Sequence, residues 1–178
     1  MEINIKRVHG GNNPVIECID HKYDIYRVRT DYQPYYDEDS GEQSGYTFIE
    51  KEFPYKPSMK EVRDFIHGVI NAQTDEKILS GFVWNGINIW LSEENQRNFS
   101  EAQRIAASMP EAILPVTFKL GEDENGEPVY HQFETAQELT GFYMSAVAYI
   151  NRCLAEGWQM KDNFDFTPYE QILSPSKP

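Results

Sequence analysis

The chain has 178 residues, and its 16 Lys and Arg stand against 29 Asp and Glu, which gives a formal net charge of −13 at pH 7. Binding to nucleic acid or to an anionic membrane depends on clustered Lys and Arg, so this charge argues against both as partners. The length and a hydrophobic fraction of 40% predict a globular chain of one domain or two small ones.

The N-terminus and the two cysteines bear on where the protein acts. Residues 1–11 contain no apolar segment of the kind that forms a secretory signal peptide, and no run approaches the roughly 20 apolar residues of a membrane span. Cys18 and Cys153 are far apart and lack a CxxC spacing, so they predict neither a disulfide framework nor a zinc site. We therefore expect reduced thiols in a protein that no signal peptide secretes.

The first part of the chain has the pattern of short strands followed by one helix. An antiparallel meander is expected from strands near Ile3–Ile5 and at Val15–Ile19, Tyr23–Thr30 and Gly45–Phe53. Residues 31–44 contain Pro, Gly and five acidic residues, which predicts a mobile loop or a long hairpin tip. Ser58 and Glu61 form a capping box at the start of a helix, whose apolar face comprises Val62, Phe65, Ile66, Val69 and Ile70.

The strongest local signal in the chain is Asn85-Gly86 between two apolar runs. An Asn-Gly pair favours a two-residue type I′ turn, because both positions of that turn need a positive φ. With this turn, Trp84 faces Ile87 and Phe82 faces Ile89 across the hairpin. Such cross-strand pairs stabilise a hairpin by roughly 0.2–1 kcal/mol each.

A helix and a second hairpin follow. Ser92 is the predicted N-cap of the helix, which is expected to end near Ser108. Strands at Pro115–Leu120 and Pro128–Phe133 flank the turn signal Asn125-Gly126. If that turn has two residues, the opposed pairs are Phe118 with Phe133 and Leu120 with His131.

The longest helix is expected to begin at a second capping box, Thr135-x-x-Glu138. Apolar residues then recur at helical spacing as far as Leu154. Gly157 is placed for a C-terminal cap, and Trp158 for folding back onto the last turn.

The order of these elements predicts an α+β protein: antiparallel N-terminal strands plus one helix, then a ββαββα module of two layers. The expected division is a β-rich module at residues 1–76, the ββαββα module at 77–162 and a loosely attached tail at 163–178. The polar segment Asn71–Lys77 is the expected boundary. If Phe82 and Trp84 pack together with the Val62–Ile70 helix, this boundary is wrong.

No motif in the sequence carries chemistry. GxSxG, Walker and GxGxxG sequences are absent, and the four histidines, His9, His21, His67 and His131, lie far apart. The acidic cluster at residues 37–42 departs from a calcium-binding loop, since Gly41 is one position early and Phe48 stands at the twelfth position. We therefore predict no catalytic residue, metal site or cofactor.

Tyrosines are concentrated near the N-terminus, where seven of the eleven precede Lys56. Tyrosine offers a large rigid contact surface with a polar end, and it is enriched at interfaces. The candidate binding residues are those around the acidic segment, namely Tyr32, Tyr35, Tyr36 and Tyr46. They could contact protein or sugar, and the alternative is that they only pack a modest sheet.

Several blocks of the second half recur in order in a known family. These are Gly81–Gly86, Trp90–Asn95, Leu114–Lys119, Pro128–His131 with Phe133, Phe142–Tyr143, Ala146–Ile150, Leu154–Trp158 and Lys161–Asp162. Over residues 81–162 the chain resembles an uncharacterised domain family of phage and prophage tail-associated proteins, including those of Bacteroides-type prophages. The resemblance implies an origin beside tail or tail-fibre genes and an action in the host cytoplasm or in the virion. It implies no catalytic residues.

Three functions remain open on the sequence. The first is a non-enzymatic phage accessory protein: a tail or tail-fibre component, or an assembly factor, that contacts a tail or fibre protein or forms a homo-oligomer. The second is an acidic inhibitor that mimics nucleic acid and binds a host protein, which the net charge motivates. The third is an enzyme whose site is gathered in space, with His131 as the residue to follow.

Overall fold

The computed structural model describes residues 7–123 and 125–174, so the strand expected at Ile3–Ile5 lies outside the described residues. The chain divides into two compact units. The N-terminal unit combines the residues up to Ala72 with those from Met160 onward, and the central unit comprises Gln73–Gln159.

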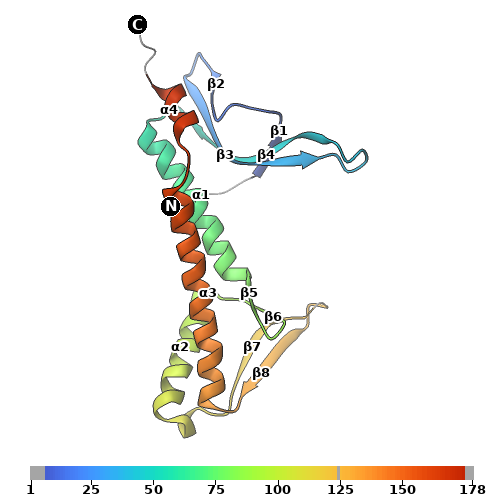
Figure 1. Cartoon of the computed structure of the whole chain (residues 1–178), viewed down its shortest axis with the longest axis vertical. Helices are drawn as coiled ribbons and strands as arrows, with labels where there is room; N and C mark the ends of the chain where they lie inside the picture. The colour runs from blue at the N-terminus through green and yellow to red at the C-terminus, as the bar shows by residue number, and fades with distance from the viewer. Residues whose placement is uncertain (1–6, 124, 175–178) are drawn as a thin grey trace. The chain divides into compact units, whose positions relative to one another are not determined.

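The N-terminal unit contains a four-stranded antiparallel sheet (Figure 1). Its strands are β1 (Arg7–Gly10), β2 (Ile16–Asp20), β3 (Ile25–Tyr36) and β4 (Gln43–Phe53), in the order β1-β4-β3-β2. The predicted meander is correct for β2, β3 and β4, but β1 pairs with β4 at the other edge. The sheet therefore has the strand order of a Greek key.

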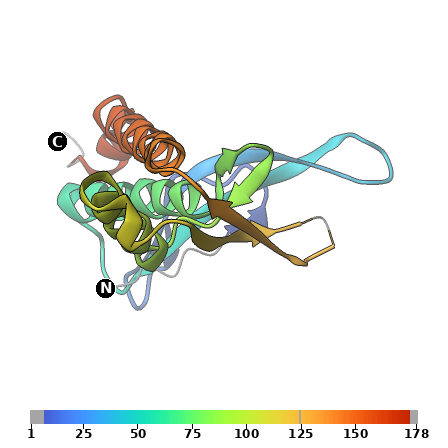
Figure 2. The same ribbon diagram turned by 90° about the horizontal axis from the view of Figure 1, so that it is seen from below.

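Strands β3 and β4 extend into residues 31–44, for which the sequence predicts a mobile loop or a long hairpin tip. Gln33 pairs with Thr47, and Tyr36 pairs with Gln43, so only residues 37–42 form the tip. Asp31 has a φ of 54°, and the register of the two strands shifts between Thr30 and Gln33. Figures 1 and 2 show the resulting long hairpin, which we call the β3–β4 arm.

Helix α1 (Met59–Ser80) begins at the predicted capping box. The Ser58 backbone N–H donates to the Glu61 carboxylate at 2.8 Å, and the Glu61 N–H donates to Ser58 Oγ at 3.3 Å. The hydrogen bond from Ser58 N–H, with others from Tyr55 and Ser58 hydroxyls, lowers the pKa of Glu61 to about 2. The helix continues through Asn71–Lys77, because a polar segment without Gly or Pro has no residue that stops it.

The core of the N-terminal unit lies between one face of the sheet, α1 and the short helix α4 (Thr167–Leu173). Its buried side chains come from all three, and they include Val28, Ile49, Val62, Phe65, Ile66, Val69, Phe166 and Tyr169. The Tyr169 hydroxyl donates to the Arg29 carbonyl oxygen at 2.8 Å. Residues 163–174, for which only loose attachment was expected, thus contribute two buried aromatic side chains to this core.

The central unit has the predicted order of strand, strand, helix, strand, strand, helix. Its elements are β5 (Phe82–Trp84), β6 (Ile87–Ile89), α2 (Glu93–Ser108), a 3₁₀ turn η1 (Pro110–Ala112), β7 (Val116–Glu122), β8 (Pro128–Phe133) and α3 (Ala136–Asp162). Together with the N-terminal sheet, these elements confirm the α+β class.

The first hairpin of the central unit has the predicted register. Trp84 pairs with Ile87 and Phe82 with Ile89. Asn85 and Gly86 have φ values of 49° and 79°, as a type I′ turn requires. Phe82 is buried in the central core and Trp84 packs against that core, whereas the Val62–Ile70 side of α1 lies in the N-terminal core.

The register predicted for the second hairpin is wrong. Val116, not Phe118, faces Phe133, and Phe118 faces His131. The loop is longer than two residues because the Asp123 carboxylate accepts hydrogen bonds from the N–H groups of Asn125 and Glu127, at 2.8 and 2.9 Å. A bulge between Lys119 and Gly121 completes the shift.

The expected end of the longest helix is also wrong, since α3 continues past Gly157 to Asp162. Gly157 is buried, and a Cβ at this position would lie 2.5 Å from Thr74 Oγ1. Glycine is therefore required by the close approach of α1 to α3 within the central unit, not by a helix cap. The Trp158 side chain is 59% exposed, which shows that it does not fold back onto the helix as predicted.

Aromatic rings dominate the core of the central unit. Phe142 has its ring centroid 5.0–5.2 Å from those of Phe99, Trp84 and Phe133. Phe99, Phe133 and Phe142 are at most 2% exposed. Across residues 7–123 and 125–174, no helix combines the length and apolar character needed to cross a membrane.

Candidate functional site

The four candidate tyrosines separate into two places in the N-terminal unit. Tyr32 and Tyr46 are half-buried, with ring centroids 6.3 Å apart, and the Tyr32 hydroxyl donates to the Asn13 carbonyl oxygen at 3.1 Å. Burial raises the pKa of Tyr32 to about 12, so its hydroxyl remains a donor. This pair lies beside the loop between β1 and β2.

Tyr35 and Tyr36 lie on the β3–β4 arm and are 40% and 57% exposed. The Tyr35 ring rests against His9, with centroids 4.3 Å apart. Over Tyr35–Tyr36 and residues 43–45, the two strands pair only with each other in the part of the chain that the structure describes. These two tyrosines therefore form an exposed aromatic end on a two-stranded arm, which we call the arm end.

His131 is half-buried on β8, and its Nε2 lies 2.8 Å from the Glu138 carboxylate. The ring makes T-shaped contacts with Trp84 and Phe133, with centroids 5.0 and 4.5 Å apart. The second Glu138 oxygen accepts the Glu134 N–H at 3.3 Å. Both partners of this His–Glu pair connect β8 to the first turn of α3.

Glu138 also changes the predicted capping box of α3. The Glu138 N–H donates to Thr135 Oγ1 at 3.2 Å, as expected, but its carboxylate turns to Glu134 and His131 instead of to the Thr135 N–H. Half of the box is therefore formed.

The acidic tip of the arm is a closed turn. The Asp37 carboxylate accepts the Ser40 and Asp39 N–H groups at 2.9 and 3.1 Å, and the Ser40 hydrogen bond lowers the pKa of Asp37. Among residues 7–123 and 125–174, no three His, Cys, Asp or Glu side chains gather in a way that could hold a metal ion.

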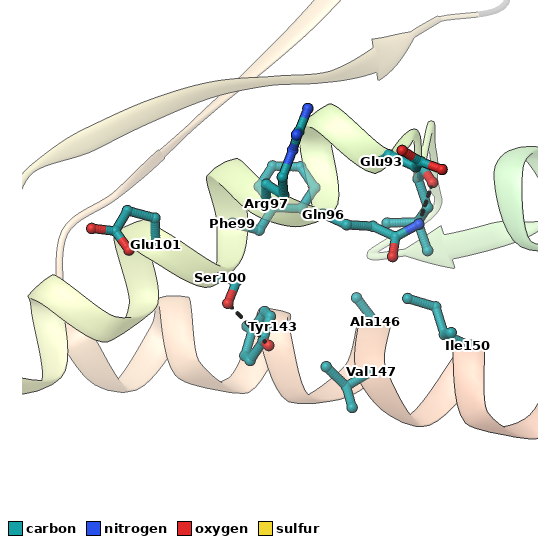
Figure 3. A pocket seen from close by; sticks show the side chains of 11 residues that line it. Glu93, Gln96, Arg97, Phe99, Ser100, Glu101, Tyr143, Ala146, Val147 and Ile150 are labelled. Atoms are coloured by element: carbon teal, nitrogen blue, oxygen red, sulfur yellow. Dashed lines mark hydrogen bonds between the residues drawn. The ribbon is translucent and has the colours of Figure 1, made fainter.

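A groove between α2 and α3 is a feature that sequence reasoning missed (Figure 3). Its volume is about 670 Å³, and its apolar lining includes Phe99, Val147 and Ile150. Tyr143 and Ser100 join its two walls through hydroxyls 3.3 Å apart. The sequence carries no signal for the groove, because the apolar pattern of α3 does not distinguish its half-buried positions from its fully buried ones.

The comparisons place the chain in a family. The family model DUF4376, a domain of unknown function, matches residues 61–173, and the chain belongs to this family. The match is wider than the resemblance over 81–162, because it begins in α1 and ends with α4. Comparisons with curated proteins and with solved structures give no match.

Proposed function

We propose that this protein is a non-enzymatic phage or prophage accessory protein: a tail or tail-fibre component, or an assembly factor, that acts by contact with another protein. The observation that carries the proposal is the arm end, where Tyr35 and Tyr36 are exposed on strands with open edges. The sequence resemblance to tail-associated proteins supports the choice of a tail or fibre protein as partner. Such a protein would act in the host cytoplasm or in the virion.

The physical case for contact at the arm end has two parts. A tyrosine buries a large surface while it loses only two side-chain torsions, so it contributes to binding at a low cost in entropy. An open strand edge presents unpaired N–H and C=O groups, which an extended segment of a partner can pair as an added strand. Tyr35 and Tyr36 would then supply side-chain contacts, while the backbone of the arm supplies hydrogen bonds.

The test is light scattering on the purified protein, alone and mixed with the products of neighbouring tail genes. We expect a stable complex with a tail or fibre protein, or a homo-oligomer. The double variant Tyr35→Ala/Tyr36→Ala should weaken that association by tenfold or more, since each tyrosine at the centre of an interface contributes roughly 1–2 kcal/mol.

The matched control is Tyr23→Ala. Tyr23 is 63% exposed and precedes β3 at the end opposite to the arm, so its loss should leave the association unchanged. A monomer that ignores all these partners would contradict the proposal, and binding to host DNA-binding proteins would then be measured. An association that survives the double variant would remove the arm end from the proposal.

A further inference from the structure

A second place in the N-terminal unit, independent of the arm end, is a shallow cavity of about 520 Å³ beside Tyr32 and Tyr46. The loop between β1 and β2 supplies Asn12 and Asn13 to its wall, and α4 supplies Gln171, among others. Three segments that are distant in sequence therefore meet around one hollow.

Among the described residues, none that lines this cavity is charged, although 45 of the 178 residues are Asp, Glu, Lys or Arg (16 + 29). Besides aromatic and amide side chains, it contains prolines and aliphatic residues, of which Ile172 is 42% exposed. The Tyr32 hydroxyl is neutral at physiological pH, as that of an ordinary tyrosine is, and burial raises its pKa further, to about 12. A site of this kind selects against phosphates, metal ions and charged peptides, because nothing in it compensates their charge.

The cavity has polar groups that the protein itself does not use. Within residues 7–123 and 125–174, the side-chain amides of Asn12, Asn13 and Gln171 and the hydroxyl of Tyr46 form no hydrogen bond. The Asn13 amide oxygen lies close to the backbone of Gly10, since a Cβ added there would be 2.9 Å from it. Each of these four groups can both donate and accept.

We propose that this cavity binds a neutral saccharide. A sugar hydroxyl also donates and accepts, so neighbouring hydroxyls can satisfy both ends of a side-chain amide, and the apolar C–H face of a sugar ring can lie against Tyr46 or Ile172. A proline-rich peptide would fit the aromatic rings, but it has no N–H at proline and would leave the amide oxygens without donors. The combination of free amides and an uncharged lining therefore favours the saccharide.

The experiment is binding of the full-length protein to an array of immobilised neutral glycans, which includes hexose polymers and N-acetylhexosamine oligomers, with decaproline on the same surface. We expect binding to at least one glycan. The exposed pair Asn12→Ala/Gln171→Ala should weaken it tenfold or more, and Tyr46→Ala should do the same. The matched control, Gln137→Ala/Asn151→Ala, removes two exposed amides from α3 and should leave binding unchanged.

Three results would overturn the proposal: no binding to any glycan, binding that the Asn12→Ala/Gln171→Ala variant retains, or binding to decaproline in place of the glycans. Because Tyr46 packs near Tyr32, its variant is interpreted only if its unfolding curve matches that of the wild type. The Tyr35→Ala/Tyr36→Ala variant should keep glycan binding, which separates this inference from the proposed protein contact.

Discussion

The two units of this protein share an α+β composition but are stabilised in different ways. The central unit encloses a cluster of aromatic rings around Phe142, which is 1% exposed. The N-terminal unit has an apolar core on one face of its sheet and a buried charge on the other, since Arg29 is 3% exposed. The core of the central unit is therefore held by apolar packing, which depends on shape and buried area. The N-terminal unit also depends on directed polar contacts.

Arg29 is the centre of these directed contacts. Its guanidinium lies 2.8 Å from Glu17 and 3.1 Å from Glu50, and it donates to the Pro14 carbonyl oxygen at 3.1 Å. Its own carbonyl oxygen accepts the Tyr169 hydroxyl from α4. One residue therefore joins three strands and the C-terminal helix, whereas no charged side chain is buried among the described residues of the central unit.

The largest effect is expected for Phe142→Ala in the central unit. Removal of a fully buried ring leaves a cavity, and the substitution should lower the free energy of unfolding by about 3–5 kcal/mol. Urea denaturation with hydrogen exchange at α2 and α3 measures it. Met144→Ala is the control on the same helix, because Met144 is 57% exposed, and it should change stability by less than about 0.5 kcal/mol. A similar loss in both variants would contradict an aromatic core centred on Phe142.

A somewhat smaller effect is expected for Arg29→Ala in the N-terminal unit. Breaking a buried ion pair costs about 3–5 kcal/mol, and we expect about 3 because Glu17 and Glu50 are partly exposed to water. Arg27→Ala is the matched control on the same strand. The Arg27 side chain is 38% exposed and lies 3.4 Å from Glu52 and 3.8 Å from Glu50, so its loss should cost at most about 1 kcal/mol. An equal loss of unfolding free energy in the two variants would contradict a special role of the buried Arg29 in stabilising the N-terminal unit.

The smallest changes in stability are expected for two glycines of α3, and the two substitutions should act in opposite directions. Gly157→Ala places a methyl group against Thr74 and should destabilise the central unit by about 1–3 kcal/mol. Gly141→Ala meets nothing within 4 Å and should stabilise the helix by about 0.5–1 kcal/mol. Thermal unfolding of both variants, and of Gly157→Ala combined with Thr74→Ala, measures the clash. A stabilising Gly157→Ala would show that α1 and α3 lie further apart at this point.

The sequence by itself determined most of the features that depend on residues within about four positions of each other, although the Asn125-Gly126 turn was longer than predicted. The Ser58–Glu61 box, the N-cap Ser92 and the Asn85-Gly86 turn all formed as predicted. Their donors and acceptors are brought together by the local backbone. The Thr135–Glu138 box is the exception, since the Glu138 carboxylate turns to His131 on β8. The same holds for the order of elements and for the apolar faces of the helices, which fixed the α+β class.

Only the tertiary structure decided which distant residues meet. It placed β1 beside β4, gave Gly157 a role in helix packing, and brought α4 into the N-terminal core. It also divided the four tyrosines, since Tyr32 and Tyr46 joined a cavity that includes Gln171 while Tyr35 and Tyr36 remained on the arm. The reason is physical: such contacts depend on how the whole chain buries its apolar area, and no local pattern of residue types encodes that choice.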